Sequence, residues 1–131
     1  MGESKSGNNK ISLKKRAKSF KYAFDGILYL VKSQHNAWVH LTIAIFAIIA
    51  GIALDVSFTE WCFLVFAIGF VLVAEAFNTA IEELTNLVSP AYDKKAGTVK
   101  DVAAGAVLIS AIVAAIVGLI IFIPKIVLLF P

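Results

Sequence analysis

The chain has few charged residues and almost no cysteine. Only 16% of its 131 residues are Asp, Glu, Lys or Arg, whereas 60% are hydrophobic and the mean hydropathy is +0.86. A soluble domain of this length could not bury so much apolar surface, which excludes an ordinary soluble protein. The single cysteine, Cys62, lies within an apolar run, which excludes a disulfide framework and a cysteine metal site. The sequence therefore predicts a small all-α integral membrane protein with one domain.

Cations are missing from one connection between apolar segments, and their distribution predicts the topology. Residues 55–60 contain Asp55 and Glu60 but no lysine or arginine, whereas the segment before residue 33 and the connection at 89–100 are rich in lysine. Cytoplasmic loops of membrane proteins carry an excess of Lys and Arg. We therefore expect the N-terminus and the 89–100 connection in the cytoplasm and the C-terminus outside, with Lys125 as the exception.

Four helical segments are expected after a polar tail. Residues 1–12 are rich in Gly, Ser and Asn and predict a disordered cytoplasmic tail, followed by a membrane domain at 13–131. Residues 13–32 predict an amphipathic helix that lies in the membrane interface, because apolar side chains recur every three or four residues opposite a row of lysines. Each further apolar segment can supply the ~20 residues that cross a bilayer. These three transmembrane spans are expected at about 37–54, 58–88 and 100–123.

Local signals predict where these helices begin and end. The run "SFTE" at 57–60 is a capping box, in which the serine side chain accepts from a backbone N–H and the glutamate reaches back. The Ser-Pro pair at 89–90 is expected to stop the second span. Thr98 is the expected N-cap of the third span, and Pro124 is expected to end or kink it.

A polar stripe follows the apolar part of the second span. At about 100° per residue, its four members fall within an arc of about 80°. They are Glu75, Asn78, Glu82 and Asn86. Carboxylates in or near a membrane are costly and usually face a protein interior or a wet cavity. Two carboxylates with an amide can hold a divalent metal and supply a base. Alternatively, Glu82 is a wet residue beyond the membrane edge and Asn78 bonds between helices.

Two motifs resemble those of the prokaryotic diacylglycerol kinase family, which includes the undecaprenol kinases. They are "EAFNTAIEEL" at 75–84 and "VKDVAAGAVLIS" at 99–110. The resemblance covers nearly the whole chain after residue 12, including "FKYAFDGI", "HNAWVHL" and "TEW". It implies an interfacial helix and three transmembrane helices, assembled as a homotrimer with shared active sites.

The resemblance also implies roles for the residues that match the family's motifs. Glu75 is implied as the catalytic base that takes a proton from the lipid hydroxyl, with Asn78 lining the lipid site beside it. Glu82 is implied as a metal ligand that reaches the ATP phosphates through Mg²⁺. Phosphoryl transfer needs positioning and neutralised charge, which such a set supplies. The implied ATP-binding positions are Lys15, Tyr22, Gln34, Glu82, Ala91, Tyr92, Asp93, Lys100 and Asp101.

The chain departs from the family's pattern at two positions. Gln34 stands where the family commonly has a glutamate that is a second metal ligand, and Asn86 stands where an aspartate is common. A glutamine oxygen can ligate Mg²⁺ but brings no charge. Both changes remove negative charge near the implied nucleotide site.

Together these observations predict a lipid kinase in a bacterial cytoplasmic membrane. It is expected to use ATP and Mg²⁺ to phosphorylate a membrane lipid hydroxyl at the cytoplasmic face, with undecaprenol favoured over diacylglycerol. Details of "IGFVLVAEAFNTAIEEL" resemble the undecaprenol kinase branch more closely. The alternative is a catalytically weak or inactive membrane protein of the same fold that binds lipid or nucleotide. No nucleic-acid partner is expected.

Overall fold

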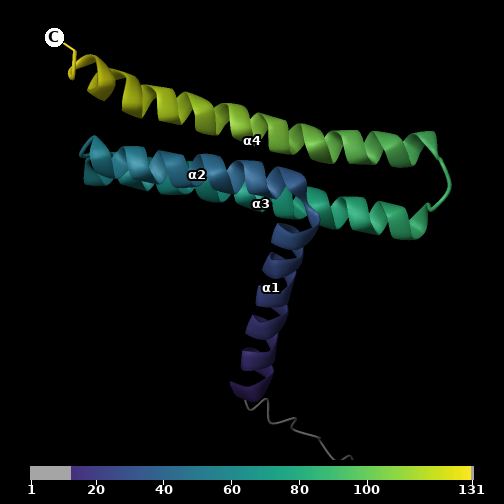
Figure 1. Cartoon of the computed structure of the whole chain (residues 1–131). Coiled ribbons are helices and arrows are strands. Elements are labelled where there is room, and N and C mark those ends of the chain that lie inside the picture. The colour runs from purple at the N-terminus through teal and green to yellow at the C-terminus, as the bar shows by residue number, and fades with distance from the viewer. Residues whose placement is uncertain (1–12, 131) are drawn as a thin grey trace, which may run out of the picture.

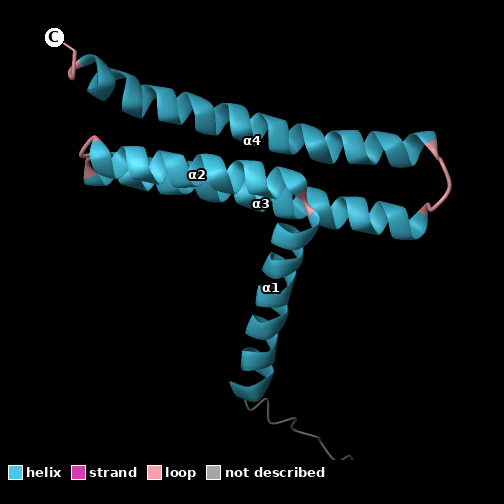
Figure 2. Ribbon diagram, viewed as in Figure 1, coloured by secondary structure: helices cyan, strands magenta, loops and turns pink. Residues whose placement is uncertain are grey.

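Four helices account for nearly all of the described chain. The computed structural model describes residues 13–130, and within this range there is no strand (Figures 1 and 2). The helices are α1 (Leu13–Ser33), α2 (His35–Ala53), α3 (Phe58–Val88) and α4 (Lys94–Val127). Of these, α2, α3 and α4 are long and apolar enough to cross a membrane. The all-α membrane architecture with an amphipathic first helix is therefore confirmed, while the predicted tail at 1–12 lies outside the described residues.

The three long helices form a bundle, and α1 leaves it at a steep angle where α2 begins (Figure 1). Helices α3 and α4 run antiparallel along most of their length, and α2 packs mainly on α3. Because α2 has 19 residues and α3 has 31, α3 is longer by about 18 Å at ~1.5 Å per residue. The last turns of α3 and the first turns of α4 therefore project beyond the point where α1 departs. We call this projecting part the 89–93 end, after its connection, and the opposite part the 54–57 end.

Helix α3 begins and ends at the predicted residues. The capping box is confirmed: the Glu60 backbone N–H donates to Ser57 Oγ at 3.4 Å, and the Ser57 N–H donates to Glu60 Oε2 at 2.8 Å. The helix ends at Val88, directly before the Ser-Pro pair at 89–90. Proline lacks the N–H that a further helical turn needs, and it restricts the residue before it.

Helix α4 begins earlier and ends later than the sequence predicted. Asp93, and not Thr98, is its N-cap, because the Asp93 carboxylate accepts from two backbone N–H groups at 2.8 and 2.9 Å. Thr98 lies inside the helix and donates its hydroxyl to the Lys94 carbonyl at 3.1 Å. Asp ranks above Thr as an N-cap, which favours the earlier start. At the other end, Pro124 lies within α4, which continues to Val127.

Lys125, the exception to the charge distribution, has a structural partner at the 54–57 end. Its ammonium pairs with Glu60 Oε2 at 3.1 Å and donates to the Asp55 carbonyl at 3.4 Å. The two paired side chains are only 23% and 32% exposed. This contact joins the end of α4 to the start of α3 and to the turn between α2 and α3. The lysine therefore neutralises the charge of the Glu60 carboxylate, which also belongs to the capping box.

The 54–57 end also contains a buried apolar cluster. Val56, Leu64 and Ile121 are buried there and bring together the turn, α3 and α4. Nearby, the Trp61 ring packs so closely over Gly51 that a Cβ at this glycine would lie 2.8 Å from a ring carbon. Close contacts between apolar side chains stabilise helical bundles. This end of the molecule therefore combines a buried apolar cluster with a paired carboxylate.

Candidate active site

Glu75 is a buried carboxylate without a partner. Its side chain is only 1% exposed, and neither carboxylate oxygen has a hydrogen-bond partner among the described residues. The Oδ1 atom of Asn78, one turn further along α3, is buried and unpartnered in the same way. Burying polar groups without hydrogen bonds is costly, so native proteins rarely do it without a functional reason. These two residues are therefore the core of the candidate site.

The α3 sequence places both groups on one face by helical spacing alone. Leu64 and Val71 form the apolar part of this face, and Glu75 follows Val71 by four residues. Beyond Glu75 the same face becomes polar, through Asn78 to the half-buried Glu82. His40 and Glu82 are the titratable neighbours that act electrostatically on Glu75. The predicted polar stripe thus begins where the apolar core of the bundle ends.

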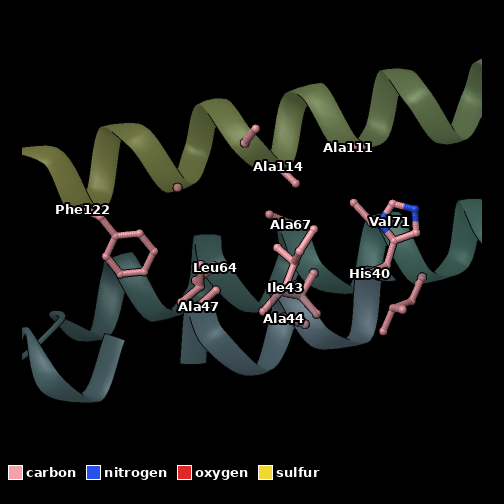
Figure 3. A pocket seen from close by; sticks show the side chains of 14 residues that line it. His40, Ile43, Ala44, Ala47, Leu64, Ala67, Val71, Ala111, Ala114 and Phe122 are labelled. Atoms are coloured by element: carbon pink, nitrogen blue, oxygen red, sulfur yellow. The ribbon is translucent and has the colours of Figure 1, made fainter. Parts of the chain in front are cut away.

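An apolar cavity lies beside the same face of α3 (Figure 3). It has a volume of about 280 Å³ and is lined by residues of α2, α3 and α4, from His40 at one end to Phe122 at the other. His40 is the polar residue of this lining, which otherwise consists of aliphatic and aromatic side chains and one glycine. Val71, one turn before Glu75, belongs to the lining, so the cavity approaches the buried carboxylate from within the membrane-spanning part.

At the 89–93 end, the polar stripe meets the start of α4. The Lys100 ammonium donates to Asn86 Oδ1 at 2.9 Å, which joins the last turns of α3 to the first turns of α4. Because the amide of Asn86 is neutral, it orients the ammonium without cancelling its charge. Asp101, the next residue, is exposed. The structure therefore places the Lys100 ammonium, held by Asn86, beyond Glu82 in the 89–93 end.

A contact that sequence reasoning missed joins α1 to this region. The Tyr29 hydroxyl donates to Glu83 Oε1 at 2.7 Å, across 54 residues of sequence. This hydrogen bond raises the pKa of Tyr29, since ionising the hydroxyl would remove the donor beside a carboxylate. Glu83 neighbours Glu82 in sequence, so the contact ties α1 to the turn of α3 that carries a predicted metal ligand. No local pattern signals a pair this far apart.

Several predicted ATP-binding residues lie apart from the buried carboxylate. Lys15 and Tyr22 are exposed in the first half of α1. Figure 1 shows that α1 departs from the bundle at its C-terminal end, so its first half points away. In the 89–93 connection, Tyr92 is 95% exposed, and Asp93 is engaged as the N-cap of α4. Gln34 is half-buried at the junction of α1 and α2. A single chain therefore brings Glu75 and Asn78 together but leaves the predicted ATP-binding residues apart from one another.

The donor set for a metal is small. Across the described residues, no group of three or more His, Cys, Asp or Glu side chains lies close enough together to hold a metal ion. Mg²⁺ commonly takes only one or two protein carboxylates and completes its coordination with substrate phosphates and water. The half-buried carboxylate of Glu82 meets this smaller requirement, and the amide oxygen of Gln34 offers a neutral ligand.

Comparison with known proteins identifies the family. The model of the prokaryotic diacylglycerol kinase family matches residues 21–122, which is most of the chain. The chain belongs to the prokaryotic diacylglycerol kinase family. The match contains the buried carboxylate, the polar stripe and the start of α4, whereas Lys15 lies before it.

Two named relatives agree with this assignment. The undecaprenol kinase of Bacillus subtilis is 36% identical over 108 residues, which cover 82% of this chain and 88% of that protein. The diacylglycerol kinase of Synechocystis sp. is 37% identical over 101 residues, which cover 76% of this chain and 58% of that protein. Both relatives bear the names of lipid kinases, so this family member is supported as a lipid kinase and the inactive alternative is not favoured.

Proposed function

We propose that this chain transfers the γ-phosphoryl group of ATP to the hydroxyl group of a membrane lipid at the cytoplasmic face of a bacterial cytoplasmic membrane. The observation that carries the proposal is the buried, unpartnered carboxylate of Glu75 beside the unpartnered amide oxygen of Asn78. A base for a lipid hydroxyl must be reachable from the membrane and shielded from bulk water. Glu75 suits both conditions, since it is buried and it follows Val71, which lines the apolar cavity, at the start of the polar stripe of α3.

Glu75 and Asn78 act on the lipid. The Glu75 carboxylate accepts the proton of the lipid hydroxyl while the lipid oxygen forms its bond to the γ-phosphorus of ATP. The bond between that phosphorus and the bridging oxygen of the β-phosphate breaks, and ADP leaves with the electron pair. Asn78, one turn away, lines the same position and orients the hydroxyl. The adjoining apolar cavity gives the region around the hydroxyl a dry surface, which strengthens electrostatic interactions there.

The nucleotide is bound at the 89–93 end. Lys100, oriented by Asn86, supplies a positive charge to the phosphates. Glu82 and Gln34 are the residues that would hold Mg²⁺, which when bound neutralises charge on the phosphates. The other proposed ATP contacts are Lys15, Tyr22, Ala91, Tyr92, Asp93 and Asp101.

A homotrimer with shared active sites accounts for the dispersed nucleotide residues. Lys15 and Tyr22 lie on the part of α1 that points away from the bundle of their own chain (Figure 1). A neighbouring copy could receive them, which would complete a nucleotide site that one chain leaves open. The lysine-rich segments before residue 33 and around residue 94 support a cytoplasmic location for α1 and the 89–93 end. The C-terminus then lies outside.

Undecaprenol is the proposed lipid, ahead of diacylglycerol. The undecaprenol kinase relative is matched over 88% of its length, against 58% for the diacylglycerol kinase relative. The test is a competition in one bilayer that contains both lipids, with Mg²⁺ and ATP labelled at the γ-phosphate. We expect most of the label in undecaprenyl phosphate. Label mainly in phosphatidic acid would overturn the lipid preference, and no label in either product would overturn the kinase function.

A further inference from the structure

We propose that Tyr29 is a positioning residue that sets the angle of α1 against the bundle through its hydrogen bond to Glu83. The inference rests on the proposed function, because the parts it aligns are those assigned to the nucleotide. Its basis is the 2.7 Å contact between the Tyr29 hydroxyl and Glu83 Oε1. Glu83 shares its helical turn with Glu82, so the contact links α1 to the turn that carries the proposed metal ligand.

Among the described side-chain hydrogen bonds of α1, the one between Tyr29 and Glu83 reaches another helix. Within the part of the chain that the structure describes, no other side-chain hydrogen bond or ion pair joins α1 to another helix. The remaining side-chain hydrogen bonds of α1 are local: Ser19 donates to the Lys15 carbonyl, and Ser33 donates to the Tyr29 carbonyl. Apolar side chains along α1, from Leu13 to Tyr29, are largely exposed. Packing within one chain therefore does little to fix the direction of α1.

The junction next to Tyr29 is a single residue. Gln34 is the one residue between α1 and α2, with extended backbone angles of φ −112° and ψ 115°. A junction of this kind fixes the position of one end of α1, and a second contact is needed to fix its direction. Tyr29 provides that second contact a little more than one turn away.

The length of α1 makes its direction matter. Lys15 lies roughly 21 Å along the helix from Tyr29, at about 1.5 Å per residue. A tilt of about 10° would move Lys15 by roughly 4 Å, whereas misplacement of a positioning group by about 1 Å can reduce a rate about 100-fold. Loss of the Tyr29 hydroxyl should therefore displace the nucleotide contacts that are proposed on α1. The same change leaves Glu75 and the lipid side untouched.

The kinetic test compares hydroxyl-deletion variants in bilayers. Tyr29→Phe keeps the ring and removes the hydrogen bond, and we expect the KM for ATP to rise about threefold to tenfold while the KM for the lipid stays unchanged. Ser19→Ala, which removes a hydroxyl with a local bond from the same helix, is the matched control and should match the wild type. Glu83→Gln keeps an acceptor oxygen, so its KM for ATP should stay close to that of the wild type. Glu83→Ala removes the acceptor, so its KM for ATP should rise as in Tyr29→Phe.

The double variant Tyr29→Phe/Glu83→Ala decides whether the two residues act together. We expect it to be no worse than either single variant, because both remove the same contact. Additive effects, or a wild-type KM for ATP in Tyr29→Phe, would overturn the proposal.

A distance measurement separates this inference from the proposed function. Spin labels at Phe20→Cys on α1 and Leu87→Cys on α3, both exposed positions, are placed in a Cys62→Ser background and diluted with unlabelled chain. Tyr29→Phe should broaden the distribution of distances between the labels. An unchanged width would overturn the positioning role. Broadening in a chain that transfers no phosphate would support the positioning of α1 and contradict the kinase function alone.

Discussion

Glu60 and Glu75 are carboxylates of the same helix, but their surroundings are opposite. Glu60, at the 54–57 end, accepts from the Ser57 N–H at 2.8 Å and pairs with Lys125 at 3.1 Å. Glu75 is more deeply buried and has no partner among the described residues. A partnered carboxylate stabilises the fold, whereas a buried one without partners destabilises it. The contrast supports the proposal that α3 carries a structural carboxylate at one end and a functional one near its middle.

The two ends of the bundle differ in the same way. At the 54–57 end, a capping box, an ion pair and the cluster of Val56, Leu64 and Ile121 leave little unsatisfied. Towards the 89–93 end, α3 and α4 extend beyond the point where α1 departs (Figure 1), and the polar side chains of Asn86 and Asp101 are exposed there. Structural contacts are therefore concentrated at the 54–57 end, whereas the proposed chemistry extends from Glu75, near the middle of α3, to the 89–93 end.

The largest effect is expected when Glu75 loses its charge. Glu75→Gln keeps the size of the side chain but removes the base, so turnover should fall about 100-fold to 10,000-fold. The transfer of labelled γ-phosphate to lipid in bilayers measures this turnover. Glu60→Gln is the matched control on the same helix and should retain turnover well below its unfolding temperature. Full turnover in Glu75→Gln would contradict the role of Glu75 as the base and leave no functional difference between the two carboxylates.

A smaller loss is expected at the positioned cation. Lys100→Met keeps the aliphatic stem but removes the charge, so kcat/KM for ATP should fall about 10-fold to 100-fold. Lys94→Met removes the same charge from an exposed position at the start of α4 and should change the value less than about twofold, as expected for a surface charge. Equal effects of the two substitutions would mean that net charge, and not the contact with Asn86, is what matters.

At the 54–57 end, a substitution should affect stability and not chemistry. Gly51→Ala would place a methyl group 2.8 Å from the Trp61 ring, and the resulting overpacking should cost about 1–3 kcal/mol. The free energy of unfolding in mixed micelles measures this. Gly69→Ala is the control, since nothing lies within 4 Å of the added Cβ. If Gly51→Ala lost turnover while its stability stayed unchanged, the division between the two ends would not hold.

The smallest effect is expected from restoring charge at the junction of α1 and α2. Gln34→Glu adds a carboxylate at the proposed second ligand position, so half-maximal turnover should need about threefold to tenfold less Mg²⁺. Asn36→Asp adds the same charge at an exposed position two residues on and is the control. A Mg²⁺ requirement that is unchanged in Gln34→Glu would remove this position from the proposed metal site.

Sequence patterns were sufficient wherever the cause is local. The bounds of α3 follow from the capping box at 57–60 and the Ser-Pro pair at 89–90, which act within one turn. The polar stripe follows from helical spacing. The predicted start of α4 was wrong because Asp93 and Thr98 are both capable N-caps, and Asp93, which ranks higher, caps the helix.

Contacts between distant residues could not be predicted in this way. Tyr29 meets Glu83, and Lys125 meets Glu60, only because the helices pack in one particular arrangement. The complete burial of Glu75 without a hydrogen-bond partner could not be predicted from the sequence either. Its position in α3 was evident, but the absence of a partner depends on what α2 and α4 place against it.

The roles of the two carboxylates are tested most directly by comparing the thermal unfolding midpoints of Glu75→Gln and Glu60→Gln. We expect a midpoint equal to or above that of the wild type for Glu75→Gln, because a neutral amide is cheaper to bury than an unpartnered carboxylate. We expect a lower midpoint for Glu60→Gln, because the charge that pairs with Lys125 is lost. If Glu75→Gln lowered the midpoint as much as Glu60→Gln, Glu75 would be a structural residue and the central claim would be contradicted.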